Sequence, residues 1–403
     1  MAQQLHVGVA LDGAGWHPAA WREPNSRPAE LFTAGYWTDL ATTAQRGLLD
    51  FVSIDDSLAV PGDRGTADGG PADRVRARID AHLIAARIAP VTRHIGLIPT
   101  ITTTHTEPFH VSTALATLDY TSRGRAGWQA RVSATAAEAA HFGRRTVPEL
   151  TGAELAQAHA TGTFPDFVRD LFDEAADAVE VVRRLWDSWE DGAEIRDVAT
   201  RRFIDRGKLH YIDFRGRYFD VRGPSITPRP PQGQPVVTAL AHAPLIYEFA
   251  ARSADLVFVT PARDTGPEAI LEQVAAAADA VGRTGEPLRT YADLVVFLDT
   301  ADTTGPQRLA RLDDTAGAEF VSDAAIFAGS ADDLADLLVD WAARGVDGFR
   351  LRPGVAVDDL AAITDRLVPA LQRRGVFRTG YPDGPLRALL GLPTTVPNRY
   401  ATA

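Results

Sequence analysis

Eight short apolar runs, separated by helical patterns, constrain the fold of this chain more than any other feature of its sequence. In three of the intervening segments, 73–89, 173–189 and 331–345, apolar residues return every three or four positions, as in helices with one buried face. Repeated alternation of strand and helix predicts a parallel sheet, and eight units predict a closed (β/α)8 TIM barrel; an open doubly wound sheet is the alternative. The predicted strands are 5–11, 50–54, 94–103, 125–133, 235–240, 255–260, 292–298 and 347–353.

The spacing of the predicted strands is uneven. Residues 134–234 separate the fourth strand from the fifth, and residues 299–346 separate the seventh from the eighth, whereas a βαβ unit needs only roughly 30 residues. We therefore expect insertions after strands 4 and 7, on the face of a barrel where active sites lie. No repeat or low-complexity block indicates a second domain, so residues 1–403 are expected to form one domain with a C-terminal tail from about residue 376.

The first insertion ends in a proline-rich segment, "GRYFDVRGPSITPRPPQGQPVV" at residues 216–237. Its five prolines are Pro224, Pro228, Pro230, Pro231 and Pro235. Proline fixes φ and donates no backbone hydrogen bond, so the segment is expected to cross the surface as an extended strap. Residues 208–221, which overlap its start, predict a hairpin around Gly216.

Composition excludes several classes of partner. The formal net charge of -12 disfavours a nucleic-acid or anionic-membrane surface, because those partners need a cationic face. The chain contains no cysteine, which excludes disulfides, thiolate metal sites and a cysteine nucleophile. Neither a signal peptide nor an apolar run of membrane-spanning length is recognisable. A cytoplasmic protein is expected.

Familiar catalytic motifs are missing from the sequence. There is no G-x-S-x-G elbow, P-loop or G-x-G-x-x-G after a strand, so hydrolase, nucleotidase and dinucleotide-binding functions lose their usual support. The segment "HTEPFH" imitates a metal motif, but Pro108 interrupts the helix that would align its two histidines, and no metal is predicted. Threonines and a histidine at 100–105 end the third strand and indicate a ligand site, although threonine is also common in strands.

Seven motifs carry a resemblance to a known family. They resemble the bacterial luciferase-like flavin monooxygenases, in particular the nitrilotriacetate monooxygenase-like branch. The resemblance covers almost the whole chain. It implies a (β/α)8 barrel, reduced FMN supplied by a separate flavin reductase, and oxidation of a small organic substrate with O2. The motifs are "HPAAWREP" (17–24), "DFVSIDDSLA" (50–59), "IGLIPTITTTHTEPFHVS" (95–112), "ATLDYTSRGRAGW" (116–128), "LWDSWEDGA" (185–193), "YFDVRGPSITPRPPQGQPVV" (218–237) and "LRALLGL" (386–392).

The resemblance also implies a set of cofactor residues. Matching the motifs places Asp56 at the end of the second strand, Thr102 and Thr103 on the third, and Gln129 and Ser133 on the fourth, all around the flavin. Plainer roles are open for two of them, since Asp56 could cap the following loop and Gln129 could be a satisfied interior amide. The proline strap would fix the fifth strand, whose end meets the flavin phosphate.

Substrate-side candidates and the assembly are further implications. His17, Trp21 and His105 are candidate catalytic residues, because aromatic and imidazole groups at strand ends can face a flavin ring or a substrate; ordinary packing is the alternative. A homodimer is expected from the resemblance. Apolar residues in the helices after strands two and three, such as Leu83, Ile84 and Ile88, are candidates for its interface, although they could equally cover the barrel.

Three departures from the branch affect the cofactor site. Gln129 replaces an asparagine, Leu171 and Phe172 replace an Arg-Tyr pair, and "TALAH" at 238–242 replaces Gln-Ala-Gly-x-Ser. Serine and tyrosine hydroxyls are lost, and His242 is left as the expected donor to the flavin phosphate. Two other functions stay open: a flavin-binding or ligand-binding barrel without turnover, and a deazaflavin-dependent oxidoreductase.

Overall fold

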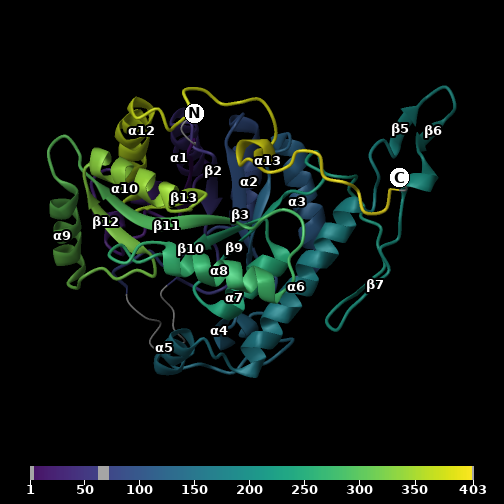
Figure 1. Cartoon of the computed structure of the whole chain (residues 1–403), viewed down its shortest axis with the longest axis horizontal. Coiled ribbons are helices and arrows are strands. Elements are labelled where there is room, and N and C mark those ends of the chain that lie inside the picture. Colours follow the sequence, from purple (N-terminus) through teal and green to yellow (C-terminus); the bar gives the residue numbers. More distant parts are fainter. Residues whose placement is uncertain (1–3, 62–71, 402–403) are drawn as a thin grey trace.

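The computed structural model describes residues 4–61 and 72–401. Its centre is a closed ring of eight parallel strands, and Figure 1 shows these strands in the middle of the molecule. Hydrogen bonds join them in the order β1–β2–β3–β4–β9–β10–β11–β13, and β13 pairs with β1 to close the ring. The predicted TIM barrel is therefore confirmed, with every predicted strand present. The strands are β1 (His6–Leu11), β2 (Phe51–Ile54), β3 (Gly96–Thr102), β4 (Gly127–Arg131), β9 (Val236–Leu240), β10 (Leu256–Val259), β11 (Arg289–Leu298) and β13 (Gly348–Pro353).

Helices cover the outside of the ring (Figure 1). Alternate side chains of the strands point outward, and Val7, Val9 and Leu351 pack there in the largest apolar cluster, as period-2 alternation requires. No helix of the described chain is both long and apolar enough to cross a membrane. The covering helices are α1 (Ala34–Arg46), α2 (Ala81–Ile88), α3 (Pro108–Ser122), α6 (Asp166–Asp187), α7 (Pro244–Ser253), α8 (Glu268–Ala280), α10 (Ala331–Ala343), α11 (Ala356–Ala362) and α12 (Val368–Arg373).

The predicted helix at 73–89 is wrong in its first half. The structure forms only α2, which begins at Ala81 after the side chain of Asp80 caps its N-terminus by accepting from the Leu83 N–H. Before it, Arg78 is drawn toward the strand ends and donates to the carboxylate of Asp12 at 2.8 Å. The helical periodicity of 73–80 is therefore overridden by an ion pair.

The two insertions lie where the strand spacing predicted them. The second adds β12, which sequence reasoning missed. It pairs in parallel with Leu294–Leu298 of β11, an edge left open because β10 pairs only with the first part of that long strand. A hairpin surrounds Gly216 as predicted. The first insertion contains α4 (Ala136–Ala140), α5 (Gly152–Thr161), α6, β5 (Glu194–Asp197), β6 (Arg202–Ile204), β7 (Phe214–Arg215) and β8 (Asp220–Val221); the second contains α9 (Gly305–Ala316), β12 (Ala325–Gly329) and α10.

The proline-rich strap and the C-terminal tail close the amino-terminal end of the barrel. Within the strap, the Gln232 amide donates to the Asp119 carboxylate at the end of α3 and to the Ala126 carbonyl before β4. Its carbonyl oxygen accepts from the Arg387 N–H of the tail. Burial raises the pKa of Asp119 to about 6, although the hydrogen bonds from Gln232 oppose that shift. The strap is thus a fixed link between the end of α3, the start of β4 and the tail.

A short tail helix, α13 (Leu386–Leu389), plugs this end of the barrel. Leu386 packs in one cluster with Phe51, Ile98 and Tyr291, which point into the ring from three different strands. In Figure 1, α13 lies above the strands, and α4 and α5 lie below them. The plugged end is therefore opposite the carboxyl ends of the strands, which form the open mouth of the barrel.

Candidate active site

The mouth is built from alternate residues of the barrel strands, which face inward. On β13 these are Arg350 and Arg352, and on β11 the inward residue at the same level is Asp293. All three side chains are buried. The barrel therefore contains a charged layer directly beneath its mouth.

Arg350 forms the deeper part of this layer. Its guanidinium donates through Nε to Asp293 at 2.8 Å and also to the side-chain oxygen of Gln129 on β4. Its Cζ lies over the ring of Phe258, 3.7 Å from the centroid. The amide of Gln129, predicted to contact the cofactor, thus has its oxygen engaged with an arginine inside the barrel.

Arg352 forms the upper part of the layer. Its Nε donates to Asp293 at 2.8 Å, and its two terminal nitrogens donate to the two carboxylate oxygens of Asp323 at 2.7 and 3.1 Å. The guanidinium lies 4.6 Å from the ring of Trp16. Asp323 comes from the loop between α9 and β12, and its carboxylate is also 3.5 Å from Nε2 of His242.

Hydroxyl groups line the ends of β3 and β4. The Thr102 and Ser133 hydroxyls lie 2.9 Å apart, and the Thr103 hydroxyl donates to the Arg131 carbonyl at 3.0 Å. The structure therefore brings together three of the predicted cofactor residues. Next to them, Oγ1 of Thr100 is buried and has no hydrogen-bond partner.

His105 follows β3 and is held in a left-handed conformation, with φ at 69°. Its ring stacks on Phe142, with centroids 4.9 Å apart, and its buried Nε2 has no hydrogen-bond partner. Burial lowers the pKa of His105, and the nearby positive charge of Arg145 lowers it further. The imidazole is therefore neutral at neutral pH and has an unused polar atom.

Two other predicted residues make structural contacts. The Asp56 carboxylate accepts from the Ser57 and Ala81 N–H groups at 2.7 and 2.9 Å, so it holds the start of α2. Burial raises the pKa of Asp56, although these hydrogen bonds oppose it. The indole of Trp21 donates to the Asp73 carbonyl at 3.0 Å.

Both ring nitrogens of His17 are engaged. Nδ1 accepts from the Ala19 N–H at 3.0 Å, which leaves Nε2 as the protonated nitrogen that donates to the Asp313 carboxylate of α9 at 3.1 Å. Burial lowers the pKa of His17, and Asp313 opposes that shift. In this arrangement His17 ties the second insertion to the loop after β1.

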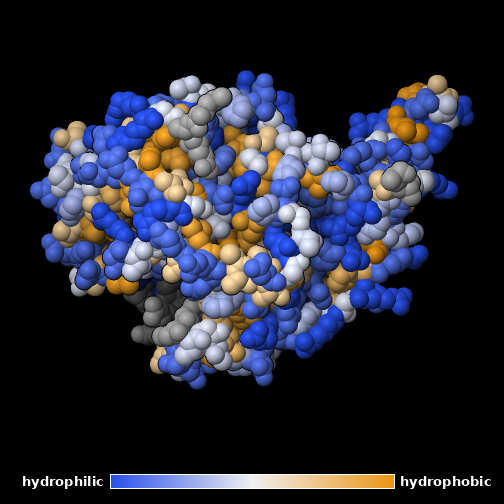
Figure 2. Space-filling model, in the orientation of Figure 1, coloured by the Kyte–Doolittle hydropathy of each residue, from blue (hydrophilic) through white to orange (hydrophobic). Residues whose placement is uncertain are grey.

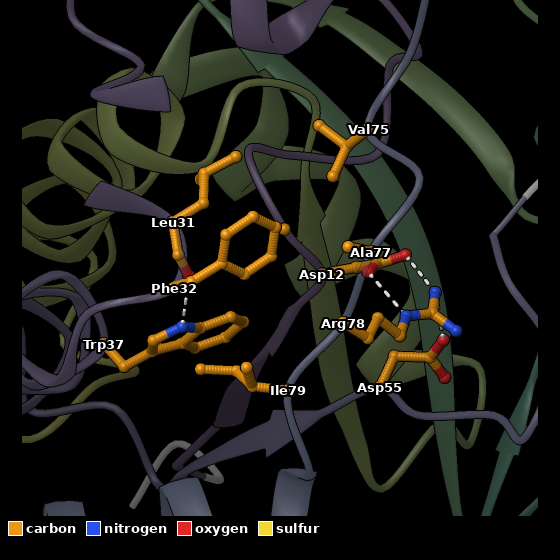
Figure 3. Close-up of a pocket in the computed structure, with 10 residues that line it drawn as sticks. Asp12, Leu31, Phe32, Trp37, Asp55, Val75, Ala77, Arg78 and Ile79 are labelled. Atoms are coloured by element: carbon orange, nitrogen blue, oxygen red, sulfur yellow. Dashed lines mark hydrogen bonds and ion pairs between the residues drawn. The ribbon is translucent and has the colours of Figure 1, made fainter. Parts of the chain in front are cut away.

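A pocket lies at the rim of the mouth, beside the ends of β1 and β2 (Figure 3). Figure 3 shows Arg78 extended toward Asp12 and Asp55, with Trp37 and Phe32 forming an apolar wall. Burial raises the pKa of Asp12, and Arg78 opposes that shift. The described residues show no group of three or more side chains placed to hold a metal ion.

Asp293, Arg350 and Arg352 were missed by the sequence reasoning, although a signal was present. Arg350 and Arg352 stand two residues apart in a predicted strand, so they share one face of it. Asp293 is a charged residue within an otherwise apolar strand. Charged residues in such strands are rarely buried unless they pair with one another.

The donors at the mouth fit a polar, aromatic cofactor. Two buried polar atoms, Thr100 Oγ1 and His105 Nε2, have no partner within the described chain, and buried polar groups in native proteins are seldom left so. Thr102, two residues after Thr100 on β3, pairs its hydroxyl with that of Ser133. A flavin ring offers carbonyl oxygens and ring nitrogens that match these groups.

A closed barrel whose polar residues gather at the carboxyl ends of its strands has the architecture of a TIM-barrel enzyme. The chain belongs to the luciferase-like monooxygenase family, whose model matches residues 15–304. The chain is similar to N-acetyl-S-(2-succino)cysteine monooxygenase of Bacillus subtilis, with 29% identity in an alignment that covers 99% of each chain. It is also similar to nitrilotriacetate monooxygenase component A of Aminobacter aminovorans, with 30% identity in an alignment that covers 97% of each chain. The predicted family and branch are confirmed.

A solved structure shares the fold. The chain aligns with a riboflavin lyase crystallised with modified FMN and riboflavin at a TM-score of 0.79 and 24% identity, over 96% of each chain. This likeness concerns the barrel and its insertions, since an identity this low shows the fold alone. The family match, not this likeness, identifies the chain as a monooxygenase of the luciferase-like type.

Proposed function

We propose that this chain is the oxygenase component of a two-component system, which uses reduced FMN from a separate flavin reductase and O2 to oxidise a small organic molecule. The observation that carries the proposal is the mouth of the family barrel, where the paired hydroxyls of Thr102 and Ser133 end β3 and β4 and the buried Thr100 Oγ1, on the same strand as Thr102, has no partner. Support for two components comes from a relative named as component A. Support for FMN comes from a structural neighbour that contains a modified form of it.

The roles of the chain's residues follow from their positions. Reduced flavin, when bound, supplies the electrons that activate O2. Thr102, Thr103 and Ser133 orient its ring by hydrogen bonding, and Gln129 is fixed for the same purpose by Arg350. The second insertion, tied down by His17 and Asp313, shields the mouth from water. The chemistry therefore demands positioning and exclusion of water rather than an acid-base pair.

The cofactor assignment is tested by anaerobic titration with reduced FMN and, in parallel, with a reduced deazaflavin. We expect saturable binding of one reduced FMN per chain and weaker binding of the deazaflavin. The reverse order of affinities would assign the chain to the deazaflavin-dependent oxidoreductases. Binding of FMN without any oxidation of substrate by O2 would instead support a binding barrel without turnover.

His242 is the proposed donor to the flavin phosphate, and its position allows a specific prediction. Its Nδ1 lies 3.1 Å from the Thr260 hydroxyl at the end of β10. The substitution His242→Ala is expected to weaken FMN binding by roughly 10- to 100-fold, since a hydrogen bond to a charged group contributes about 1.5–3 kcal/mol. Riboflavin, which has no phosphate, should bind native protein and variant equally. Equal FMN affinities at pH 6.5 would show that His242 is not a phosphate ligand.

The proposed homodimer needs a revised interface. Ile84 and Ile88 are buried in the chain's own core, whereas Leu83 is 65% exposed. The hairpin of β5 and β6 projects from the body, and apolar residues are visible on it (Figures 1 and 2). Val198 and Phe203 there are 91% and 62% exposed. Val198 and Phe203 are therefore the candidates for the interface.

Sedimentation at micromolar concentration is expected to give twice the 43.3 kDa mass of the chain. The double substitution Val198→Glu/Phe203→Glu should shift the mass toward that of the monomer, because it places charges in an apolar interface. Ile226→Glu, on an exposed position of the proline strap, is the matched control. A monomeric native chain would remove the proposal. The expectation of a cytoplasmic location stays a prediction.

A further inference from the structure

The charged layer beneath the mouth contains more positive than negative charge in its buried part. Arg350 and Arg352 share a single buried carboxylate, that of Asp293. All three are sealed from solvent, where an unpaired guanidinium is costly. The second negative charge is supplied by Asp323, whose side chain is 42% exposed.

Asp323 binds Arg352 as an anionic ligand would. Its two oxygens receive one hydrogen bond each from the two terminal nitrogens, at 2.7 and 3.1 Å, in the forked geometry that arginine forms with carboxylates and phosphates. Nε2 of His242 lies 3.5 Å from the same carboxylate. Arg352 is held rigidly by Asp293 behind it and Trp16 beside it. The cationic side of this pair is thus preorganised.

The loop that carries Asp323 has little to hold it in place at that residue. Asp323 lies between Phe320, which packs on His17, and the buried Ala324. Val321 between these anchors is 83% exposed. Within its own loop, the Asp323 carboxylate accepts a long 3.3 Å hydrogen bond from the Ser322 hydroxyl and a local one from its own backbone N–H. If Asp323 leaves Arg352, its half-exposed carboxylate is hydrated by water. If another anion takes its place on Arg352, the charge of the buried arginine remains balanced.

We propose that Arg352 and His242 form an oxyanion-binding site at the mouth, which Asp323 fills until a carboxylate or phosphate of a ligand replaces it. This inference depends on the proposed function in one respect only, the source of the anion. The anion is either a carboxylate of the substrate or the phosphate of the cofactor. Asp323 is then an internal competitor whose removal strengthens anion binding.

The test uses flavin-free protein and calorimetric titration at constant ionic strength. The probes are succinate and inorganic phosphate, with succinamide as the neutral control. Asp323→Asn is expected to bind succinate or phosphate on the order of tenfold more tightly than the native chain, and succinamide equally weakly. Adding Arg352→Lys should abolish the gain, because lysine lacks the fork. Asp332→Asn, which removes an exposed carboxylate paired with Arg374, is the control and should change nothing.

Two further arms identify the source of the anion. A gain for FMN but not riboflavin in Asp323→Asn assigns the site to the cofactor phosphate. A gain for succinate that persists with FMN bound assigns it to a substrate carboxylate. Asp323→Ala repeats the test if the asparagine variant does not fold. Unchanged anion affinity in both Asp323 variants, or a gain that survives Arg352→Lys, would overturn the proposal, while the flavin titrations judge the proposed function separately.

Discussion

Replacing Asp293 with asparagine is expected to lower the free energy of unfolding by about 3–5 kcal/mol, the cost of breaking a buried ion pair by removing one partner. Asp293 is fully buried and pairs with both Arg350 and Arg352. Asparagine has nearly the same volume as aspartate, so packing changes little. The loss of stability arises because Arg350 and Arg352 lose the buried negative charge that they share. Urea unfolding followed by circular dichroism measures the change.

A surface ion pair provides the control for this substitution. Asp365 pairs with Arg46, and both side chains are more than half exposed. Asp365→Asn should change stability by no more than about 1 kcal/mol, because solvent screens such pairs. If Asp293→Asn were as mild as this control, the charged layer would not be sealed as described.

The second large effect is expected at the plugged end of the barrel. Leu386 of the tail packs inside the ring, and Leu386→Ala should cost about 2–5 kcal/mol because it removes apolar contacts and leaves a cavity. A β-carbon on Gly96 would lie 2.4 Å from Leu386, which shows how closely the tail approaches β3. Unfolding in urea again provides the measurement.

The exposed Leu83 of α2 is the matched control for the tail. Leu83→Ala makes the same chemical change at a position that is largely open to solvent, so it should cost well under 1 kcal/mol on the usual scale for surface substitutions. Equal losses at Leu83 and Leu386 would mean that the tail does not plug the barrel.

The barrel could be predicted because each strand combines a short apolar run with a following helix, and strand length is a local property of the sequence. The failures arose where a distant residue decides the local structure. Residues 73–80 have helical periodicity, yet Arg78 pairs with Asp12, which directly follows β1 and is distant in the sequence. β12 forms because β11 has an unpaired edge, which the sequence of β12 alone does not reveal.

The candidate site was predictable only in part. Thr102, Thr103 and Ser133 lie together because parallel strands end at one edge, which follows from the fold. His17 contacts Asp313, and Asp56 contacts Ala81 at the start of α2. Both partners are distant in the sequence, so the motifs alone do not predict these contacts. Arg350, Arg352 and Asp293 required knowledge of which strands are neighbours, since β13 lies between β1 and β11.

The most direct test of the central claim is the fate of reduced FMN when its complex with this chain is mixed with O2. We expect the absorbance of oxidised flavin to return much more slowly than in free solution, because the mouth orients the cofactor and excludes water. Free riboflavin and FMN without protein are the references. Return of the oxidised absorbance at the rate of free FMN, under conditions where binding is complete, would contradict the assignment of this chain as a flavin-dependent monooxygenase.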